Sequence, residues 1–355
     1  MKENWTYKKL GEVCEIICGQ DYKSIQDDNG MFPIYGTGGV MGRASQYRCP
    51  ANSIIIGRKG NINNPLFVEE PFWNVDTAFG VVPNVSVLFP KFFYFFCKNY
   101  DFTKHDVSVT IPSLRRADII KIAVPIPPLS EQSRIVSELD LLQSIIDKQK
   151  TQLKELDNLA QAVFYDMFGD PVENDKGWEV KLLSDVSELI NGRAYKQDEL
   201  LNKGKYKILR VGNFFTNGEY YYSDLELEDE KYCDTGDLLF AWSASFGAFI
   251  WDGGKVIYHY HIWKVVYDKK VLDIQYYRFL LNAMTRFFMK DVHGIGMVHL
   301  TKAGMEQYVI PIPPLSLQQS FATKIESIEK QKAAITQSIA ETQRLFDYTM
   351  DKYFG

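Results

Sequence analysis

The hexapeptide PIPPLS occurs at residues 125–130 and again at 311–316. The match continues upstream, because LRRADIIKIAVPIPPLS (114–130) aligns without a gap to LTKAGMEQYVIPIPPLS (300–316). WTYKKLGEVCEIICGQDYK (5–23) likewise resembles WEVKLLSDVSELINGRAYK (178–196), whereas the stretches between differ in sequence and length. This pattern indicates a tandem duplication, so we expect two copies of one fold with similar ends and divergent middles.

A long helix is expected after each PIPPLS. The prolines hold the preceding backbone extended, and Ser130 and Ser316 then stand where helix N-caps are expected. The segment 316–319 also has the spacing of a capping box. Seam residues recur at alternating spacings of four and three in both helices: Ile135, Leu139, Leu142, Ile146, Gln149, Leu153, Leu156, Ala160, Val163 and Met167; Phe321, Ile325, Ile328, Lys332, Ile335, Ile339, Thr342, Phe346, Thr349 and Tyr353.

This spacing predicts a coiled coil, because a sustained 3.5-residue apolar repeat is typical of two helices that pack along one seam. The two stripes share one register, so each helix is the expected partner of the other. The alternative is that each helix only covers its own domain. The short linker GDPVENDKG (169–177) favours antiparallel pairing, which would place one globular domain at each end about a pseudo-two-fold axis.

The globular parts are predicted to be mixed α/β (α+β). Strand-like runs separated by Gly, Asn and Pro turns occur at 52–57, 237–242 and 255–267, and the spacing in 276–290 is helical. The predicted boundaries are globular domains at 1–129 and 170–315 and coiled-coil helices at 130–169 and 316–355.

Composition sets limits on the kind of protein. No apolar run is long enough to span a bilayer. The five cysteines are odd in number and scattered, which favours free thiols in a cytoplasmic protein. The net charge of −5 means that an anionic partner has to be met by local patches or with help from another subunit.

Motifs for catalysis are missing. GTGGVMG (36–42) lacks the Gly-Lys-Ser/Thr ending of a phosphate loop and is interpreted as a recognition or turn loop. His259 and His261 would share one face of the predicted strand, but no motif supplies a third zinc ligand, so a structural or contact role is favoured. HGIGMVH (293–299) has no nucleophile or paired carboxylate nearby. We therefore expect no chemistry from this chain alone.

The remaining candidates are cationic, aromatic and small polar loop residues in the divergent middles. Arg and Lys read guanine edges and hold phosphates, while Asn and Ser suit adenine edges and backbone oxygens. In the first half they are Lys23, Tyr35, Gly36, Thr37, Gly38, Arg43, Arg58, Lys59 and Lys104. In the second half they are Arg193, Tyr195, Lys196, Arg210, Asn213, Phe214, Trp242, Ser243, Ser245 and Phe246.

These features resemble the specificity subunit of type I restriction-modification systems. PIPPLSEQSRIV (125–136) closely matches the IPxPPLxEQxRI segment that opens a long helix in that family, and PIPPLSLQQSFA (311–322) matches it more loosely, with Leu317 in place of the first copy's Glu131. Segments similar to the family's target recognition domains are FPIYGTGGVMGR (32–43), IIIGRKGNI (54–62), NVDTAFGV (74–81), ILRVGNF (208–214) and GDLLFAWSASFG (236–247).

The resemblance implies a DNA-recognition subunit without catalysis or a cofactor of its own. Each domain would read half of a split double-stranded DNA target, and the helices would set the spacing and carry modification subunits. S-adenosylmethionine, ATP and magnesium are expected in the partner modification and restriction subunits. Three alternatives stay open: a specificity subunit of a type IIB-like restriction–methyltransferase, a coiled-coil spacer carrying two protein-binding modules, and a hydrolytic or metal site around His259 and His261.

Overall fold

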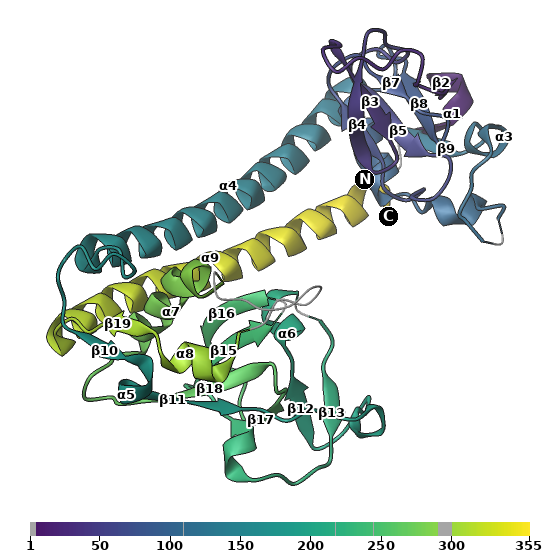
Figure 1. The fold of residues 1–355 in the computed structure, drawn as a ribbon. Coiled ribbons are helices and arrows are strands. Elements are labelled where there is room, and N and C mark those ends of the chain that lie inside the picture. Colours follow the sequence, from purple (N-terminus) through teal and green to yellow (C-terminus); the bar gives the residue numbers. More distant parts are fainter. Residues whose placement is uncertain (1–4, 109, 217, 244, 290–299) are drawn as a thin grey trace. The chain divides into compact units, whose positions relative to one another are not determined.

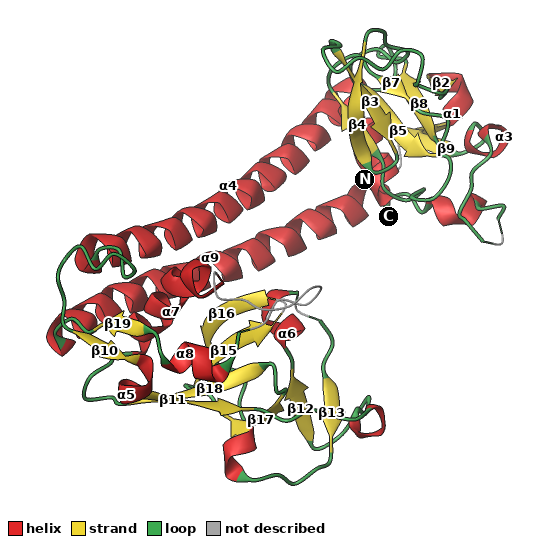
Figure 2. Cartoon of the chain, in the orientation of Figure 1, coloured by secondary structure: helices red, strands yellow, loops and turns green. Residues whose placement is uncertain are grey.

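The chain forms two compact units in the computed structural model, which describes residues 5–108, 110–216, 218–243, 245–289 and 300–355 (Figure 1). Unit 1 comprises residues 1–151 and 336–355, and unit 2 comprises 152–335. Each unit combines strands and short helices with part of two long helices, α4 (Leu129–Phe168) and α9 (Leu315–Phe354) (Figure 2). The run 293–299 lies outside the described residues.

Unit 1 contains nine described strands and four short helices besides its parts of α4 and α9. The strands are β1 (Thr6–Lys9), β2 (Cys14–Cys18), β3 (Phe32–Gly36), β4 (Gly39–Ala44), β5 (Ser53–Gly57), β6 (Leu66–Val68), β7 (Trp73–Asn74), β8 (Ala78–Pro83) and β9 (Ala123–Ile126). The helices are α1 (Leu10–Val13), α2 (Pro90–Asn99), η1 (Phe102–His105) and α3 (Arg116–Ile119).

Unit 2 follows a similar order. Its described strands are β10 (Val180–Leu182), β11 (Ser187–Asn191), β12 (Tyr206–Leu209), β13 (Tyr221–Ser223), β14 (Tyr232–Cys233), β15 (Leu238–Ser243), β16 (Ser245–Ile250), β17 (Val256–Tyr258), β18 (Ile262–Tyr267) and β19 (Val309–Pro311). Its described short helices are α5 (Leu183–Val186), η2 (Gln197–Glu199), α6 (Val211–Phe215), η3 (Asp229–Lys231), α7 (Ile274–Phe288) and α8 (Lys302–Glu306).

The two units share one sheet topology, which confirms the mixed α/β tandem repeat. The four-stranded order β2-β8-β5-β6 of unit 1 corresponds to β11-β18-β15-β16 of unit 2. The order β4-β3-β7 corresponds to the first three strands of β13-β12-β17-β14, and each set contains one parallel pair, β3 with β7 and β12 with β17. The terminal pairs β1-β9 and β10-β19 also correspond.

One predicted strand is wrong in detail. The run 255–267 forms two strands, β17 and β18, separated by a turn at residues 259–261. The His259 amide donates to the Leu209 carbonyl at 2.9 Å, which ends the parallel pairing with β12. The two imidazoles therefore lie on a turn rather than on one strand face. The strands predicted at 52–57 and 237–242 and the helix predicted at 276–290 correspond to β5, β15 and α7.

The long helices pair along the predicted seam. Every position of the two stripes is buried or half-buried. Within unit 1, the start of α4 meets the end of α9, as Arg134 donates to the Tyr353 hydroxyl at 3.0 Å. Within unit 2, the end of α4 meets the start of α9, as the rings of Phe168 and Phe321 pack at 5.3 Å. In each unit the two helix segments therefore run antiparallel.

The seam is also part of each globular core. In unit 1, Ile135 and Leu139 of α4 and Phe346 of α9 belong to one buried cluster with Phe92 and Phe95 of α2. In unit 2, Phe164 and Phe321 belong to a buried cluster with Tyr276 of α7. Each helix thus pairs with the other helix and also covers a domain, so the alternative that the helices only cover their own domains is wrong.

The helices begin one residue earlier than predicted, and buried glutamines hold their starts. Ser130 and Ser316 are the second residues of α4 and α9, so neither is an N-cap. Gln132 is fully buried; its amide group donates to the carbonyls of Val87 and Pro127 (both 2.9 Å), and its Oε1 accepts the Phe89 amide at 2.7 Å.

Gln318 repeats this arrangement in unit 2. It is fully buried, donates to the carbonyls of Val271 (3.0 Å) and Pro313 (2.8 Å), and accepts the Asp273 amide at 2.8 Å. Phe89 and Asp273 are the N-cap residues of α2 and α7. Each glutamine therefore ties the start of a long helix to the start of the helix that packs beneath it.

No helix among the described residues is long and apolar enough to cross a membrane. The five cysteines are free thiols, and four of them are buried.

Candidate nucleic-acid interface

Equivalent turns lie at the end of the parallel strand pair in each unit. They are residues 75–77, between β7 and β8, and residues 259–261, between β17 and β18. The Arg58 amide donates to the Thr77 carbonyl at 2.8 Å, and the Trp242 amide donates to the His261 carbonyl at 3.1 Å. The same backbone bond therefore occurs directly after β5 in unit 1 and near the end of β15 in unit 2, and it makes Arg58 and Trp242 structural counterparts.

Different side chains perform the same contact at these counterpart positions. The Arg58 guanidinium donates through Nη1 to the Asp76 carbonyl at 3.3 Å. The Trp242 indole donates through Nε1 to the Tyr260 carbonyl at 2.8 Å. Both contacts hold the middle residue of the turn, so the backbone is kept while the chemistry presented at the surface changes.

A loop after the first long strand of each unit packs against the same place. The Gln20 amide donates to the Asn74 carbonyl at 3.1 Å, and the Arg193 amide donates to the Tyr258 carbonyl at 3.0 Å. The preceding residues are Gly19 and Gly192. A Cβ at either would lie 1.9 Å or 2.3 Å from a carbonyl oxygen of the neighbouring chain segment, so only glycine allows this approach.

Four segments therefore converge at one edge of each unit. We define edge 1 as residues 19–23, 36–38, 58–59 and 75–77, and edge 2 as residues 192–196, 210–213, 242–243 and 259–261. Edge residues come from loops and strand ends on a shared scaffold, which is the usual location of binding residues. Most of the residues predicted from the sequence lie on one of these two edges.

On unit 1, some of the predicted residues are exposed, and others already pack against neighbouring side chains. Thr37 and Gly38 form the turn of the β3–β4 hairpin, which confirms that the glycine-rich run is a turn loop. Lys23 and Lys59 are exposed. The Tyr35 ring packs against Phe72 at 5.5 Å.

Three predicted residues of unit 1 lie outside edge 1: Tyr35, which directly precedes residues 36–38, Arg43 and Lys104. Arg43, on β4, donates to the carbonyls of Gly30 and Met31, both at 2.6 Å. Lys104 lies on η1 with its ammonium group 5.9 Å from the Tyr100 ring centre.

On unit 2, several predicted residues are already paired. Arg193 donates two hydrogen bonds to the Glu199 carboxylate, at 2.9 and 2.7 Å. Asn213 accepts the Arg210 amide at 2.8 Å and donates to the Gly218 carbonyl at 2.8 Å, so its amide group closes its own loop. Lys196 is exposed.

The aromatic candidates of unit 2 are all half-buried. Tyr195 stacks on the His259 ring at 6.3 Å, and Trp242 stacks on Trp263 at 5.3 Å. Phe214 stacks on Phe249 at 4.3 Å, and Phe246 packs against the main core of unit 2. These rings support the edge and leave limited surface for a ligand.

The serines of this region differ in exposure. Ser243 is buried, and its hydroxyl has no hydrogen-bond partner among the described residues. Ser245 lies half-buried on β16, just outside edge 2.

A hollow of about 300 Å³ opens on edge 2. Its lining comes from the end of β12, from α6 and the loop after it, and from the 259–261 turn: Arg210, Val211, Gly212, Asn213, Thr216, Gly218, Glu219, His259 and His261. Burial first, and then the nearby charges of His261 and Arg210, lower the pKa of His259 to about 4, so the ring is neutral at pH 7. The sequence had pointed to this histidine pair only as a structural or contact feature.

Within the part of the chain that is described, no cluster of three His, Cys, Asp or Glu side chains could hold a metal ion. His259 Nδ1 instead accepts the His261 amide at 3.4 Å.

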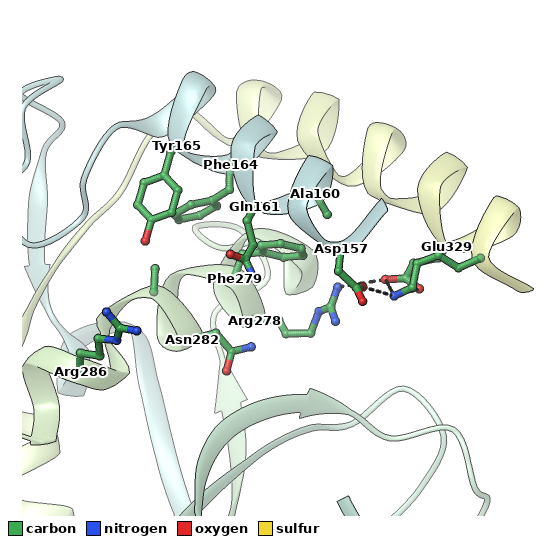
Figure 3. A pocket seen from close by; sticks show the side chains of 12 residues that line it. Asp157, Ala160, Gln161, Phe164, Tyr165, Arg278, Phe279, Asn282, Arg286 and Glu329 are labelled. Carbon is green, nitrogen blue, oxygen red and sulfur yellow. Dashed lines mark hydrogen bonds and ion pairs between the residues drawn. The ribbon is translucent and has the colours of Figure 1, made fainter. Parts of the chain in front are cut away.

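A second, larger hollow of about 600 Å³ lies in unit 2 between α7 and the two long helices (Figure 3). Its wall holds a charge network: Lys332 contacts Asp157 at 2.8 Å and Glu329 at 3.2 Å, and Arg278 lies 3.7 Å from Glu329. Burial opposes the charge of Lys332, but its hydrogen bonds and charge interactions with Asp157 and Glu329 together outweigh burial and raise its pKa. This network explains how a lysine is accommodated in the seam of α9.

Comparison with known proteins identifies the family. Residues 2–158 and 175–343 match the family described as type I restriction modification DNA specificity domain. The chain belongs to this family.

Two curated relatives are specificity subunits of Methanocaldococcus jannaschii. The type I restriction enzyme MjaIX specificity subunit is 24% identical over 305 residues, covering 77% of this chain and 68% of the relative. The MjaVIII specificity subunit is 20% identical over 376 residues, covering 92% and 86%.

Solved structures show the same fold. The chain matches the S subunit of a type I restriction-modification system from M. genitalium with a TM-score of 0.60 at 13% identity, covering 99% of this chain and 96% of that one. It also matches a chain from a study of complex assembly and conformational transition of the type I R-M system, with a TM-score of 0.61 at 18% identity and coverage of 99% and 98%. Specificity subunits of this family thus share the two-domain repeat described above.

Proposed function

We propose that this chain is the specificity subunit of a type I restriction-modification complex, in which edge 1 reads one half of a bipartite DNA target and edge 2 reads the other half. The observation that supports this most directly is the pair of edges. Their backbone hydrogen bonds coincide, whereas their side chains differ at the counterpart positions Arg58 and Trp242. One scaffold with two different surfaces suits the reading of two different base sequences.

The roles of the remaining parts follow from this proposal. Residues 1–129 and 170–315 are the two target recognition domains, and 130–169 and 316–355 are the helices that set the spacing and carry the modification subunits. Methyl transfer from S-adenosylmethionine belongs to those modification subunits, and ATP- and magnesium-dependent translocation and cleavage belong to the restriction subunits. The chain itself contributes no catalytic residue, and the complex works on double-stranded DNA in the cytoplasm.

The test is methylation-site mapping with the complex of this chain and its modification subunit. Replacing both Arg58 and Lys59 by Ala should relax one half-site, and replacing Arg210 and Ser245 should relax the other. Each lost base contact should cost about 1–3 kcal/mol of discrimination. A change on one edge that alters both half-sites would contradict two independent readers.

Affinity gives a second test of the same proposal. The net charge of −5 gives the chain little long-range attraction for phosphates, so it should bind DNA weakly alone and much more tightly with the modification subunit. Tight sequence-specific binding by the chain alone would count against the proposed division of labour.

A further inference from the structure

The hollow on edge 2 contains an arginine, Arg210, whose guanidinium has no acidic partner within the described part of the chain. Arg210 is exposed and lies over the Tyr221 ring, 5.3 Å from its centre. Among the described residues it forms no ion pair, whereas the nearby Arg193 is held by both oxygens of Glu199. The ring restricts Arg210 without neutralising its charge, so its N–H groups remain free to donate to a ligand.

His259 adds a second donor of fixed orientation. Its Nδ1 accepts the His261 amide, so the proton of the neutral ring is on Nε2. Tyr195 stacks against one face of this ring, which limits its rotation.

The same hollow also contains a hydrogen-bond acceptor, the Glu219 carboxylate. Glu219 lines it, is exposed, and forms no ion pair with any described residue. Its carboxylate therefore complements the donors of Arg210 and His259. A G·C pair shows this complement in the major groove, because guanine presents the acceptors O6 and N7 and cytosine presents the N4 amino donor.

Edge 1 has neither the arginine nor the two histidines at its counterpart positions. The strand pairing makes Gly36 the counterpart of Arg210, and the turn places Val75 and Thr77 where unit 2 has His259 and His261. Gly36, Val75 and Thr77 offer no charged or imidazole donor. The Arg210 and His259 donors that line the hollow are therefore specific to unit 2.

We infer that this hollow reads one G·C base pair in the half-site of unit 2, with Arg210 on guanine O6 and N7, His259 supporting the guanine contact, and Glu219 accepting from cytosine N4. The inference rests on the proposed function and specifies its substrate at one position.

The experiment uses the full chain with its modification subunit and measures affinity for, and methylation of, duplexes carrying the mapped target. 7-Deazaguanine, which lacks the N7 acceptor, replaces each guanine of the unit 2 half-site in turn. At one guanine the substitution should weaken binding by the wild-type complex several-fold, and Arg210→Ala should lower the preference for that G·C pair by about tenfold to a hundredfold. The Arg210→Ala complex should then be insensitive to 7-deazaguanine at that position.

Two controls separate this inference from general damage. Arg286→Ala removes an exposed arginine on α7, far from edge 2 in sequence, and should leave all preferences unchanged. The half-site read by unit 1 should keep its full preference in the Arg210→Ala complex, which shows that the complex is folded.

Glu219→Gln tests the proposed acceptor. It should lower the preference for the same base pair as Arg210→Ala does.

The outcomes are distinguishable. If the wild-type complex methylates a bipartite target but Arg210→Ala stays as sensitive to 7-deazaguanine as wild type, the inference is wrong and the proposed function stands. A unit 2 half-site made only of A·T pairs would overturn it in the same way. If the wild-type complex shows no sequence preference, both the inference and the proposed function fail.

Discussion

Gln132 and Gln318 are the residues whose contacts are repeated most closely in the two units. Each makes three hydrogen bonds inside the protein, to the segment before its own helix and to the start of the helix beneath it. Replacing either by Ala leaves buried backbone groups without partners, so we expect a loss of about 2–4 kcal/mol in the free energy of unfolding. Urea unfolding of the full chain measures this loss.

Gln337→Ala is the matched control for these variants. Gln337 lies exposed on α9 and donates to the exposed Glu341 one turn further along the helix, so its loss should cost less than about 0.5 kcal/mol. Hydrogen exchange should place the weakening in unit 1 for Gln132→Ala and in unit 2 for Gln318→Ala. Equal destabilisation by all three variants would show that the buried glutamines have no special role.

His259 should make the stability of unit 2 depend on pH. Burial lowers its folded-state pKa to about 4, below the ordinary histidine value of 6.5, with Arg210, His261 and Tyr195 as the neighbouring titratable groups. Between these values the unfolded chain binds a proton that the folded chain does not, so stability falls as pH falls through 6.5 towards 4. Discounting for partial exposure, the loss from pH 7 to pH 5 is about 1–2 kcal/mol.

His259→Gln tests this contribution, because the amide oxygen can still accept the His261 amide while the titration is removed. Denaturant unfolding at pH 7 and pH 5 should show a smaller drop in stability for the variant than for the wild type. Other groups titrate equally in both chains, so the difference between the two drops isolates His259. Equal losses in the free energy of unfolding for the wild type and the variant would mean that the folded-state pKa of His259 is not lowered.

The sequence predicted which residue types lie on the edges, but it did not predict which of their side chains are already paired within the protein. Cationic loop residues such as Arg58, Arg193 and Arg210 were all predicted from the sequence. Only the structure shows that Arg193 forms an ion pair with Glu199, whereas Arg210 forms no ion pair with any described residue. That distinction depends on which loops meet in space. A single sequence without its strand pairing does not supply it.

At the scale of elements, local periodicity predicted more than long-range pairing did. The seam of α4 and α9 was read directly from residue spacing, because a helical stripe depends only on neighbours along the chain. The division of 255–267 into β17 and β18 was missed, because the turn is set by parallel pairing with β12, far away in sequence. The β-branched and aromatic residues on both sides of the turn gave no local sign of it.

The long helices should act as a ruler between the half-sites. The division between units crosses α4 after Thr151 and α9 before Thr336, so insertions near these points leave the contacts of both units intact. One heptad inserted after Gln149 and another after Ile335 lengthen both helices by about 10 Å while keeping the seams in register. Methylation mapping should then show a non-specific spacer longer by about three base pairs.

An insertion after Gln149 alone is the control for the ruler. It shifts one half of the α4 seam against an unchanged α9, so pairing should be lost in one unit and stability should fall. Four residues inserted in each helix instead of seven would rotate the seam and should also fail. An unchanged spacer in the double heptad variant would show that the helices do not measure the distance.

At the scale of the whole molecule, the duplication predicts that one half of the chain can replace the other. In unit 1, Phe346, Met350 and Tyr353 at the end of α9 complete the core. By the seam register their counterparts at the end of α4 are Ala160, Phe164 and Met167. A fragment of residues 1–169 should therefore dimerise, with the end of each α4 taking the place of the absent α9.

This homodimer should be weaker than the natural pairing, for reasons that can be tested. Ala160 fills less space than Phe346, and Met167 lacks the Tyr353 hydroxyl, which accepts from Arg134 at 3.0 Å and donates to Glu138 at 2.8 Å. Ala160→Phe in the fragment should therefore tighten dimerisation about tenfold or more, since a buried phenylalanine contributes about 1.5–3 kcal/mol. Light scattering over a range of concentrations measures the dimerisation constants of the fragment and of its Ala160→Phe variant.

With the modification subunit, the dimer should methylate an inverted repeat whose halves both match the half-site of unit 1. A fragment that stays monomeric with and without Ala160→Phe, or a dimer that methylates only asymmetric sites, would show that the sequence repeat does not make the two halves of the chain interchangeable.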